Sequence, residues 1–366
     1  MGKQGKYIYG IINSNGEGSF MPYRATDCEE VYPVRDMESG QESRISNMVY
    51  TIPYRDISAV VSDSDIVDYT YMHRDALARL LVKHQKVNER IMGLGLAIIP
   101  MRLGTFAVDE TEVRDVLNKG YSLIKEIAEE VQDKIEIDIV ATWADFPSVL
   151  KEVGEEKEIR EFKERVLDSP NGVSIDDQMR VGVMVKEALD EKRKRYAEGI
   201  QNTLNPIYQD SKIHELMDDK MVINAAFLIE RSKQRYLYGK IEGLNVEFRE
   251  RLNFRCVGPL PTYSFYTLEV KKMRFEEIDW ARKRFGLNYA TNKDEIKKTY
   301  YRLASYLHPD KNPNLPNIER EFDDVTKAYK ILIDYCLSCE RSGQGVGYSF
   351  NKEEFNKNVI LVKIRE

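Results

Sequence analysis

The sequence predicts an α+β protein, built from two α+β units with a helical middle region, plus an all-α helical hairpin near the C-terminus. Short β-branched and aromatic runs alternate with stretches in which apolar residues recur every three or four positions. A longer helical pattern separates two such groups, and two amphipathic helices flank His308-Pro309-Asp310. A chain of 366 residues exceeds what one hydrophobic core usually organises, so several domains are expected.

The first α+β unit is expected within residues 1–145. Its predicted elements are strands at Tyr7–Ile12 and Ile57–Ser62, helices at Leu77–Ile91 and Val113–Val131, and a strand at Ile135–Ile139. In the last strand Glu136 and Asp138 alternate with isoleucines, the pattern of a half-exposed strand. This order predicts a mostly antiparallel sheet with helices on one face. Residues 13–48 are polar and interrupted by Gly and Pro, and are expected to form a loop.

The middle of the chain, residues 146–215, is predicted to be helical, because the apolar pattern from Asp176 to Leu204 is long enough for a two-helix or coiled-coil-like arm. A second, smaller α+β unit is expected at 216–272. It has a strand at Val222–Ile229, a helix at Glu230–Ile241, a strand region at Asn245–Val257 and a rigid corner at Gly258–Pro261. Residues 343–366 form a linker and a C-terminal strand at Val359–Ile364, which either adds an edge strand to the second α+β unit or reaches out to a partner.

Bulk composition favours a water-soluble protein of a reducing cytoplasm. The net charge of −6 gives no reason to expect nucleic-acid binding. The N-terminus lacks the apolar core of a signal peptide, and no run approaches the ~20 apolar residues that span a bilayer, so no membrane contact is expected. Four scattered cysteines are too few for a disulfide framework: Cys28, Cys256, Cys336 and Cys339.

The hairpin at 273–342 carries the most specific motif. Its first helix turns Ile296, Tyr300, Leu303 and Leu307 to one side, and its second repeats the spacing with Ile318, Phe322, Val325, Tyr329 and Leu332. His-Pro-Asp alone is a weak tripeptide, but between a basic helix and a Phe-x-x-Val-x-x-Ala-Tyr helix it is specific. The segments DEIKKTYYRLASYLHPDKN and EREFDDVTKAYKIL resemble the J-domain family.

That resemblance implies recruitment and stimulation of a DnaK-type chaperone ATPase. It implies that the chaperone is contacted by His308, Pro309 and Asp310, with Lys297, Lys298 and Arg302 supplying a basic face. An exposed carboxylate on a rigid loop can pair with a partner arginine, and a basic stripe attracts an acidic surface. The sequence departs from the best-known members: its first J helix, Trp280–Leu287, lacks the usual tyrosine pair, and the Gly/Phe linker and paired-cysteine zinc region are absent.

The preceding ~270 residues are similar to the gas vesicle protein F/L family. The segments that carry this similarity are Tyr7–Ile12, Asp56–Ser62, Ile99–Phe106, Trp143, Ala225–Ile229 and Phe254–Phe265. In the last of these, Leu260 and Thr262 stand where Trp and Pro are common. The resemblance implies ferredoxin-like α+β domains, a location at the gas vesicle, and contact with the gas vesicle shell protein and other gas vesicle proteins. It implies no enzymatic chemistry.

Several other residues have side chains that could form functional sites. His84 lies on an apolar helix face and is interpreted as a core histidine, whereas His73 and His214 are interpreted as surface residues. Cys336 and Cys339 form a Cys-x-x-Cys without a second pair, so zinc or redox use is a minority hypothesis. Arg102 is expected to form a structural ion pair beside a tight turn at Gly104. The basic run Lys192–Arg195 is expected to be a solvated helix face. No catalytic residues, cofactor or metal are predicted.

The sequence is compatible with three hypotheses about function. The first is a gas vesicle assembly or minor structural protein that binds the shell protein and recruits a DnaK-type chaperone. The second is a general J-domain co-chaperone that holds misfolded clients. In the third, the hairpin has lost its chaperone contact and only docks within the protein, which the intact His308-Pro309-Asp310 argues against.

Overall fold

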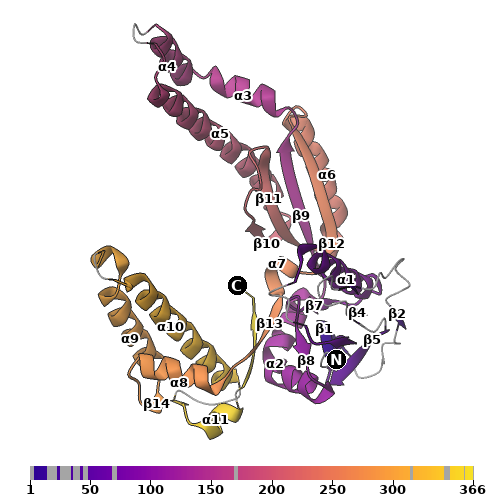
Figure 1. Ribbon diagram of the computed structural model, residues 1–366. Helices are drawn as coiled ribbons and strands as arrows, with labels where there is room; N and C mark the ends of the chain where they lie inside the picture. The colour runs from indigo at the N-terminus through magenta and orange to yellow at the C-terminus, as the bar shows by residue number, and fades with distance from the viewer. Residues whose placement is uncertain are drawn as a thin grey trace. The chain divides into compact units, whose positions relative to one another are not determined.

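The structure of the protein is a computed structural model that describes residues 4–14, 23–24, 34–35, 42–43, 48–67, 72–168, 172–313, 316–341, 347–357 and 359–365. The chain divides into two compact units, the first formed by Met1–Gln132 with Tyr266–Glu366 and the second by Asp133–Phe265 (Figure 1). Its mixed helices and antiparallel sheets confirm the predicted α+β class. Cys28 and most of the expected loop at 13–48 lie outside the described residues.

The first unit begins with an antiparallel sheet. Its spatial order is β2 (Tyr23–Arg24), β5 (Met48–Tyr54), β6 (Ile57–Asp65), β1 (Gln4–Asn13) and β7 (Ile98–Pro100), with β8 (Phe106–Ala107) also paired to β1. A separate two-stranded pair is formed by β3 (Val34–Arg35) and β4 (Glu42–Ser43). The two helices of this region both pack on the interior strand β1 and on its neighbour β7.

Helices α1 (Arg74–Gly93) and α2 (Glu110–Val131) lie on opposite faces of this sheet. Tyr7 and Tyr9 of β1 contact His84 of α1, whereas Ile8 and Ile11 belong to the core that α2 covers. The expectation of helices on one face was therefore wrong. The physical reason is that β1 is apolar at consecutive positions, so that both of its faces must be buried.

The C-terminal hairpin follows the predicted pattern. Its elements are α8 (Phe275–Arg284), β14 (Ala290–Thr291), α9 (Lys293–Tyr306), the short 3-10 helix η4 (Pro309–Lys311) and α10 (Ile318–Arg341). The segment after it, where a linker was expected, also contains β15 (Tyr348–Ser349) and α11 (Lys352–Lys357). Asn292 caps α9, because its Oδ1 accepts a hydrogen bond from the Glu295 amide at 2.9 Å. Ile296 of α9 and Val325 and Leu332 of α10 are buried in one core.

The terminal strand β16 (Ile360–Ile364) pairs antiparallel with β13 (Leu268–Lys272). The chain thus folds back past the hairpin and adds a strand to residues 268–272, which lie within the range 216–272 expected for the second α+β unit. In the structure, however, these residues belong to the first compact unit and not to the unit that holds the rest of that range. A parallel bridge between Met101 and Leu268 joins β13 to the end of β7.

The second unit contains a four-stranded antiparallel sheet and the helical arm. The strand order is β10 (Tyr208–Ile213), β11 (Met221–Glu230), β9 (Lys134–Trp143) and β12 (Leu252–Leu260). Its helical elements are α3 (Phe146–Gly154), α4 (Lys157–Leu167), α5 (Ile175–Leu204), η3 (Arg231–Lys233) and α6 (Gln234–Glu247), and α7 (Tyr263–Tyr266) runs up to its boundary. Strand β9 was expected in the first unit, but it pairs with β11 and β12.

Glu136 of β9 is 1% exposed, so that strand is not simply half-exposed. Its carboxylate accepts hydrogen bonds from the backbone N–H of Ser264 at 2.7 Å and from the Ser264 hydroxyl at 2.8 Å. Burial raises the pKa of Glu136, and the nearby Asp138 carboxylate acts in the same direction. The carboxyl group therefore fixes the corner after β12 to the centre of the sheet.

None of the helices that the structure describes combines the length and the apolar character needed to span a bilayer.

Candidate chaperone-docking site

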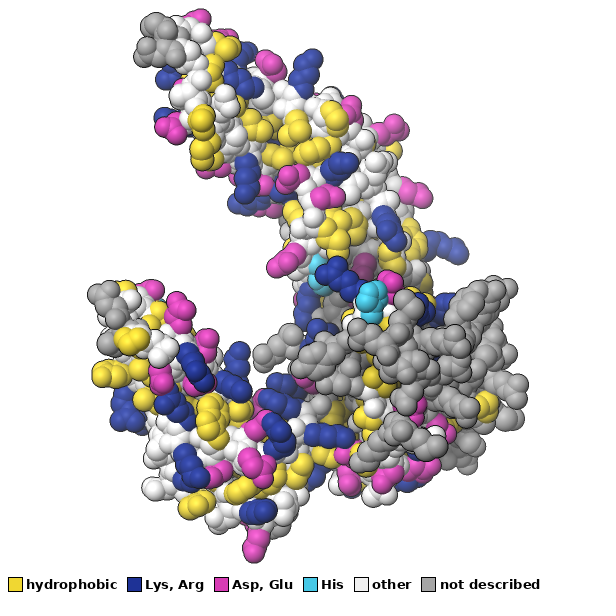
Figure 2. All heavy atoms as spheres, in the orientation of Figure 1, with side chains coloured by type: hydrophobic (Ala, Val, Ile, Leu, Met, Phe, Trp, Pro, Cys, Tyr) yellow, Lys and Arg dark blue, Asp and Glu magenta, His cyan; other side chains and the backbone are white. Residues whose placement is uncertain are grey.

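Helix α9 separates an apolar face from a basic face. Ile296 and Thr299 are buried, and Tyr300 stacks on Tyr329 of α10 with ring centroids 4.2 Å apart. The side chains of Lys297, Lys298 and Arg302 are exposed. Figure 2 shows Lys and Arg side chains on the hairpin surface. The packing of α9 on α10 thus holds one side of the helix, and the basic side remains open to a partner.

The His-Pro-Asp loop is held by local hydrogen bonds. His308 is the N-cap of η4, and its Nδ1 accepts from the Asp310 amide at 3.2 Å. Asn312 Nδ2 donates to the carbonyls of Tyr306, at 2.8 Å, and His308, at 3.2 Å. The His308 ring also packs edge-on against Phe322 of α10, at 5.5 Å between centroids. Hydrogen bonds therefore hold the backbone of the His-Pro-Asp loop, and contact with Phe322 holds the His308 ring.

The Asp310 carboxylate is the most accessible group of the loop, with 88% of its side chain exposed. It lies 3.7 Å from His308 Nδ1, and among the described residues no Lys or Arg ion pair with it is present. An exposed carboxylate on a fixed backbone can accept a bidentate bond from a partner arginine. Exposed cations on α9 would attract an acidic partner surface.

Two exposed aromatic residues of α9 add to this surface. Tyr301, 67% exposed, faces away from the hairpin core. Tyr306, 77% exposed, was not singled out from the sequence, although its place two residues before His308 was the available signal. Lys311, whose Nζ donates to Ser305 Oγ at 3.0 Å, was also not singled out.

Cys336 and Cys339 are core residues of α10. Both are fully buried in the hairpin core with Tyr335 and Phe350. Burial raises the pKa of both thiols, that of Cys339 to about 11, so neither forms a thiolate readily. Within the described part of the chain, no cluster of three or more His, Cys, Asp or Glu side chains is placed to bind a metal ion.

His84 and Arg102 have structural partners. His84 is buried, with Tyr7 Oη 2.8 Å from its Nδ1 and Asn88 Nδ2 3.2 Å from its Nε2, which confirms a core histidine. Arg102 pairs with Glu269, and Gly104 adopts a φ of 84° in the adjoining turn, as interpreted from the sequence.

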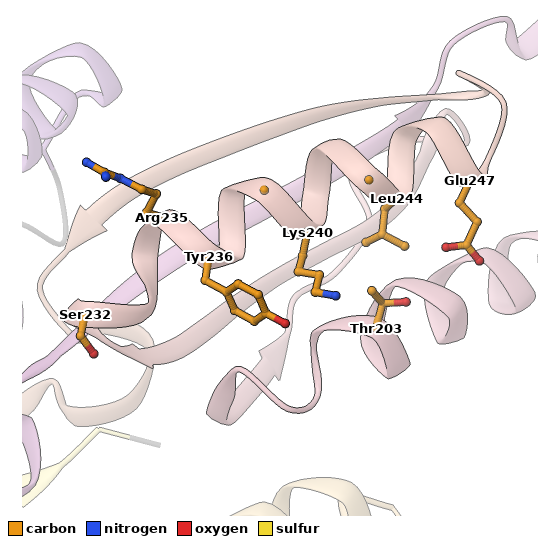
Figure 3. A pocket seen from close by; sticks show the side chains of 9 residues that line it. Thr203, Ser232, Arg235, Tyr236, Lys240, Leu244 and Glu247 are labelled. Atoms are coloured by element: carbon orange, nitrogen blue, oxygen red, sulfur yellow. The ribbon is translucent and has the colours of Figure 1, made fainter.

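A shallow groove runs along α6 in the second unit (Figure 3). It is lined by Ser232, Arg235, Tyr236, Lys240, Leu244 and Glu247 of the η3–α6 segment and by Thr203 of α5, with Gly239 and Gly243 leaving its floor open. Lys240 Nζ lies 5.4 Å from the Tyr236 ring centroid. The side chains do not converge on a common point, so the groove is not assigned as a chemical site.

Helix α5 exposes an apolar stripe on the helical arm. Ile175 is 75% exposed, Met179 66%, and Val183 is also exposed. Their spacing of four residues places them on one side of the helix. The basic run farther along the helix is partly paired, since Lys192 Nζ lies 2.8 Å from Glu152 and Arg193 bonds Asp190 at 2.5 Å.

The fold combines an α+β body with a helical hairpin that carries an intact His-Pro-Asp loop. The sequence profile of "Gas vesicle synthesis protein GvpL/GvpF" matches residues 5–267, and that of "DnaJ domain" matches 283–336. The chain therefore belongs to the GvpL/GvpF family and carries a DnaJ domain.

Individual relatives agree with this division. Gas vesicle protein F of Dolichospermum flosaquae is 24% identical over 199 residues, which cover 53% of this chain and 79% of the relative. Chaperone protein DnaJ of Chlorobium chlorochromatii is 47% identical over 47 residues, 13% of this chain and 12% of the relative. The chain thus spans only about an eighth of that chaperone.

Solved structures show the same fold for the body. The crystal structure of gas vesicle protein GvpF from Anabaena sp. PCC7120 matches with a TM-score of 0.55 at 20% identity, covering 72% of this chain and 98% of that one. The GvpF structure from Microcystis aeruginosa matches with a TM-score of 0.53 at 20% identity, covering 72% and 99%.

Proposed function

We propose that this protein is an assembly factor or minor component of gas vesicles that binds the vesicle shell protein and recruits a DnaK-type chaperone to it. Membership of the GvpL/GvpF family supports the vesicle role, and the intact, exposed His-Pro-Asp loop supports recruitment. Its place of action would be the cytoplasmic gas vesicle. Neither role requires catalytic residues or a cofactor on this chain.

In this proposal, His308, Pro309 and Asp310 contact the chaperone and the basic face of α9 orients it. The decisive observation is that Asp310 is exposed and held by a fixed backbone. The test is single-turnover ATP hydrolysis by the host DnaK-type chaperone. Stimulation by the intact chain and its loss with Asp310→Asn would support recruitment. Asp323→Asn, which removes an exposed carboxylate from α10, is the matched control and should stimulate normally.

The basic face can be tested in the same assay. Lys298→Glu should weaken stimulation, and the weakening should shrink at high salt because screening reduces long-range attraction. Lys330→Glu makes the same charge change on the exposed side of α10 and serves as control. If Lys298→Glu and Lys330→Glu weakened stimulation equally, the proposal that the basic face of α9 orients the chaperone would be wrong.

We further propose that the exposed stripe of α5 contacts the shell protein. Exposed apolar patches on soluble proteins often mark protein-binding surfaces, and shell subunits are expected to be apolar. Met179→Asp should reduce co-purification of co-expressed shell protein, while Gln178→Asp, an exposed neighbour on α5, should not. Undiminished co-purification with Met179→Asp would place the contact elsewhere.

The second candidate is a general co-chaperone for misfolded clients. The same apolar stripe would favour it, since such a surface can hold unfolded chains. Suppression of the aggregation of unrelated proteins, at the concentration that protects the shell protein, would support this candidate over the first.

A further inference from the structure

The C-terminal strand β16 is buried on both faces. Val362 is fully buried in the core of the first sheet and α2, where Leu268 of β13 joins it. Leu361, the adjacent residue, is equally buried in the core of the DnaJ-type hairpin. Successive side chains of a strand point to opposite faces, so one short strand contributes to two cores. The uninterrupted apolar run Val359–Val362 is the sequence signature of a strand covered on both sides.

The face toward the N-terminal sheet is fitted closely. A Cβ placed at Gly120 of α2 would lie 3.0 Å from the Cβ of Val362, so the strand approaches this helix where the helix has no side chain. Lys272 of β13 pairs with Glu112 of α2 at 2.8 Å. The Arg102 amide donates to the Leu268 carbonyl at 2.7 Å, which ties β13 to the first sheet.

The face toward the hairpin is fixed by a buried charge. Asp334 of α10 is 7% exposed, and its carboxylate binds Lys271 of β13 at 2.5 Å and Lys363 of β16 at 3.1 Å. A buried carboxylate is costly unless it is paired, so separating the ribbon from α10 would leave this charge without its partners. Ser338 Oγ also donates to the Ile360 carbonyl at 3.1 Å.

We propose that the β13–β16 ribbon is a strap that fixes the DnaJ-type hairpin to the N-terminal α+β domain as one rigid body. The strap consists of Leu268–Lys272 and Ile360–Ile364, two segments separated in sequence by the whole hairpin. Its consequence for the chaperone, which rests on the proposed function, is that the His-Pro-Asp loop is presented at one orientation relative to this domain. A hairpin on a flexible linker would sample many orientations.

A strand that only ended a sheet would differ from β16 in the polarity of its two faces. An edge strand that only ends a sheet usually keeps one face polar toward water. Here only Lys363 interrupts the apolar sequence of β16, and its charge is used by Asp334. Both faces are therefore committed to contacts within the chain.

The test is amide 15N relaxation on the full-length protein, which reports the tumbling of each domain separately. The intact chain should give one rotational correlation time for amides of α2 and of α9–α10. A chain ending at Asn358 loses β16 but keeps the hairpin core residues Phe350 and Phe355. In it the hairpin amides should tumble faster than those of α2 while keeping their dispersed chemical shifts.

A second variant leaves the strand and the hairpin sequence unchanged. Gly120→Leu fills the space that Val362 occupies and also favours the helical conformation of α2. It should release the hairpin in the same way. Two different correlation times in the intact chain, or one common time retained with Gly120→Leu, would each overturn the strap. Chaperone stimulation is not part of this readout, so the strap can stand where recruitment fails, and the reverse.

Discussion

Acidification should loosen the N-terminal sheet through His84. This imidazole is buried between α1 and β1, and desolvation lowers its pKa to about 4, from 6.5 in an exposed histidine. The unfolded chain therefore binds the proton more tightly than the folded one, and stability is lost as the pH falls below 6.5 toward 4. Each pKa unit corresponds to about 1.4 kcal/mol, so the complete loss is about 3 kcal/mol, of which about 2 kcal/mol has occurred at pH 5.

Hydrogen exchange measured by mass spectrometry is the suitable assay, because it resolves one sheet within a two-unit chain. Peptides covering β1 and α1 would be followed at pH 7 and pH 5, with exchange rates corrected for the intrinsic effect of pH. His84→Gln is the matched variant, since glutamine keeps polar atoms near Tyr7 but does not titrate. It should lower the opening free energy at both pH values, because the hydrogen bonds to Tyr7 and Asn88 change.

The informative quantity is the difference in pH dependence between the two proteins. Carboxylates such as Asp63 add an acid-sensitive contribution to both proteins. Burial raises the pKa of Asp63, but the hydrogen bonds from Lys6 and Tyr50 together with the charge of Lys6 outweigh burial and lower it. That shared contribution cancels in the comparison. The intact protein should lose about 2 kcal/mol more than His84→Gln between pH 7 and pH 5. Parallel pH profiles would refute the assignment of His84 as a neutral core residue.

Three further outcomes are expected from the hairpin and its surroundings. Cys336 should react with alkylating reagents more slowly than half-buried Cys256 in the native chain, and the two should become similar in denaturant; native labelling of Cys336 first would contradict its burial. Leu332→Ala should destabilise the hairpin by about 2–5 kcal/mol, followed by Trp280 fluorescence during denaturation, and a cost under about 1 kcal/mol would mean a loosely packed core. Asn292→Ala should cost about 1 kcal/mol in the same assay through loss of the α9 cap, and no change would assign the cap to other groups.

Local periodicity was sufficient to predict the hairpin. The apolar positions of α9 and α10 recur at helical spacing, and Pro309 cannot continue α9, so the helices and the loop between them follow from nearby residues. The site residues on α9 could be placed on its open side for the same reason. Which partner they contact could be inferred only from resemblance, because exposure does not identify a partner.

The features of the fold that the sequence did not predict, such as the sheet to which β9 belongs and the burial of Glu136, depend on contacts between residues far apart in the chain. Alternation in β9 shows a strand with two different faces, but not the sheet to which it belongs, since β11 and β12 are its neighbours only after folding. Burial of Glu136 likewise depends on Ser264, which follows 128 residues later in the chain. The continuous apolar sequence of β1 did contain the signal for helices on both faces of the first sheet.

A strand that is apolar at consecutive positions also occurs in the part of the chain that neither family profile matches. The GvpL/GvpF match ends at residue 267 and the DnaJ match covers 283–336, whereas the ribbon is built from Leu268–Lys272 and Ile360–Ile364. A junction between two modules has to satisfy contacts that neither module makes alone, and a strand with two apolar faces does this with few residues. Lys271 and Lys363 of the ribbon both pair with Asp334, a residue of the DnaJ match, so the ribbon also binds the hairpin through charges. The covalent link alone would leave the hairpin free to reorient, and the proposed role of the ribbon is to fix the hairpin to the N-terminal α+β domain within the first unit.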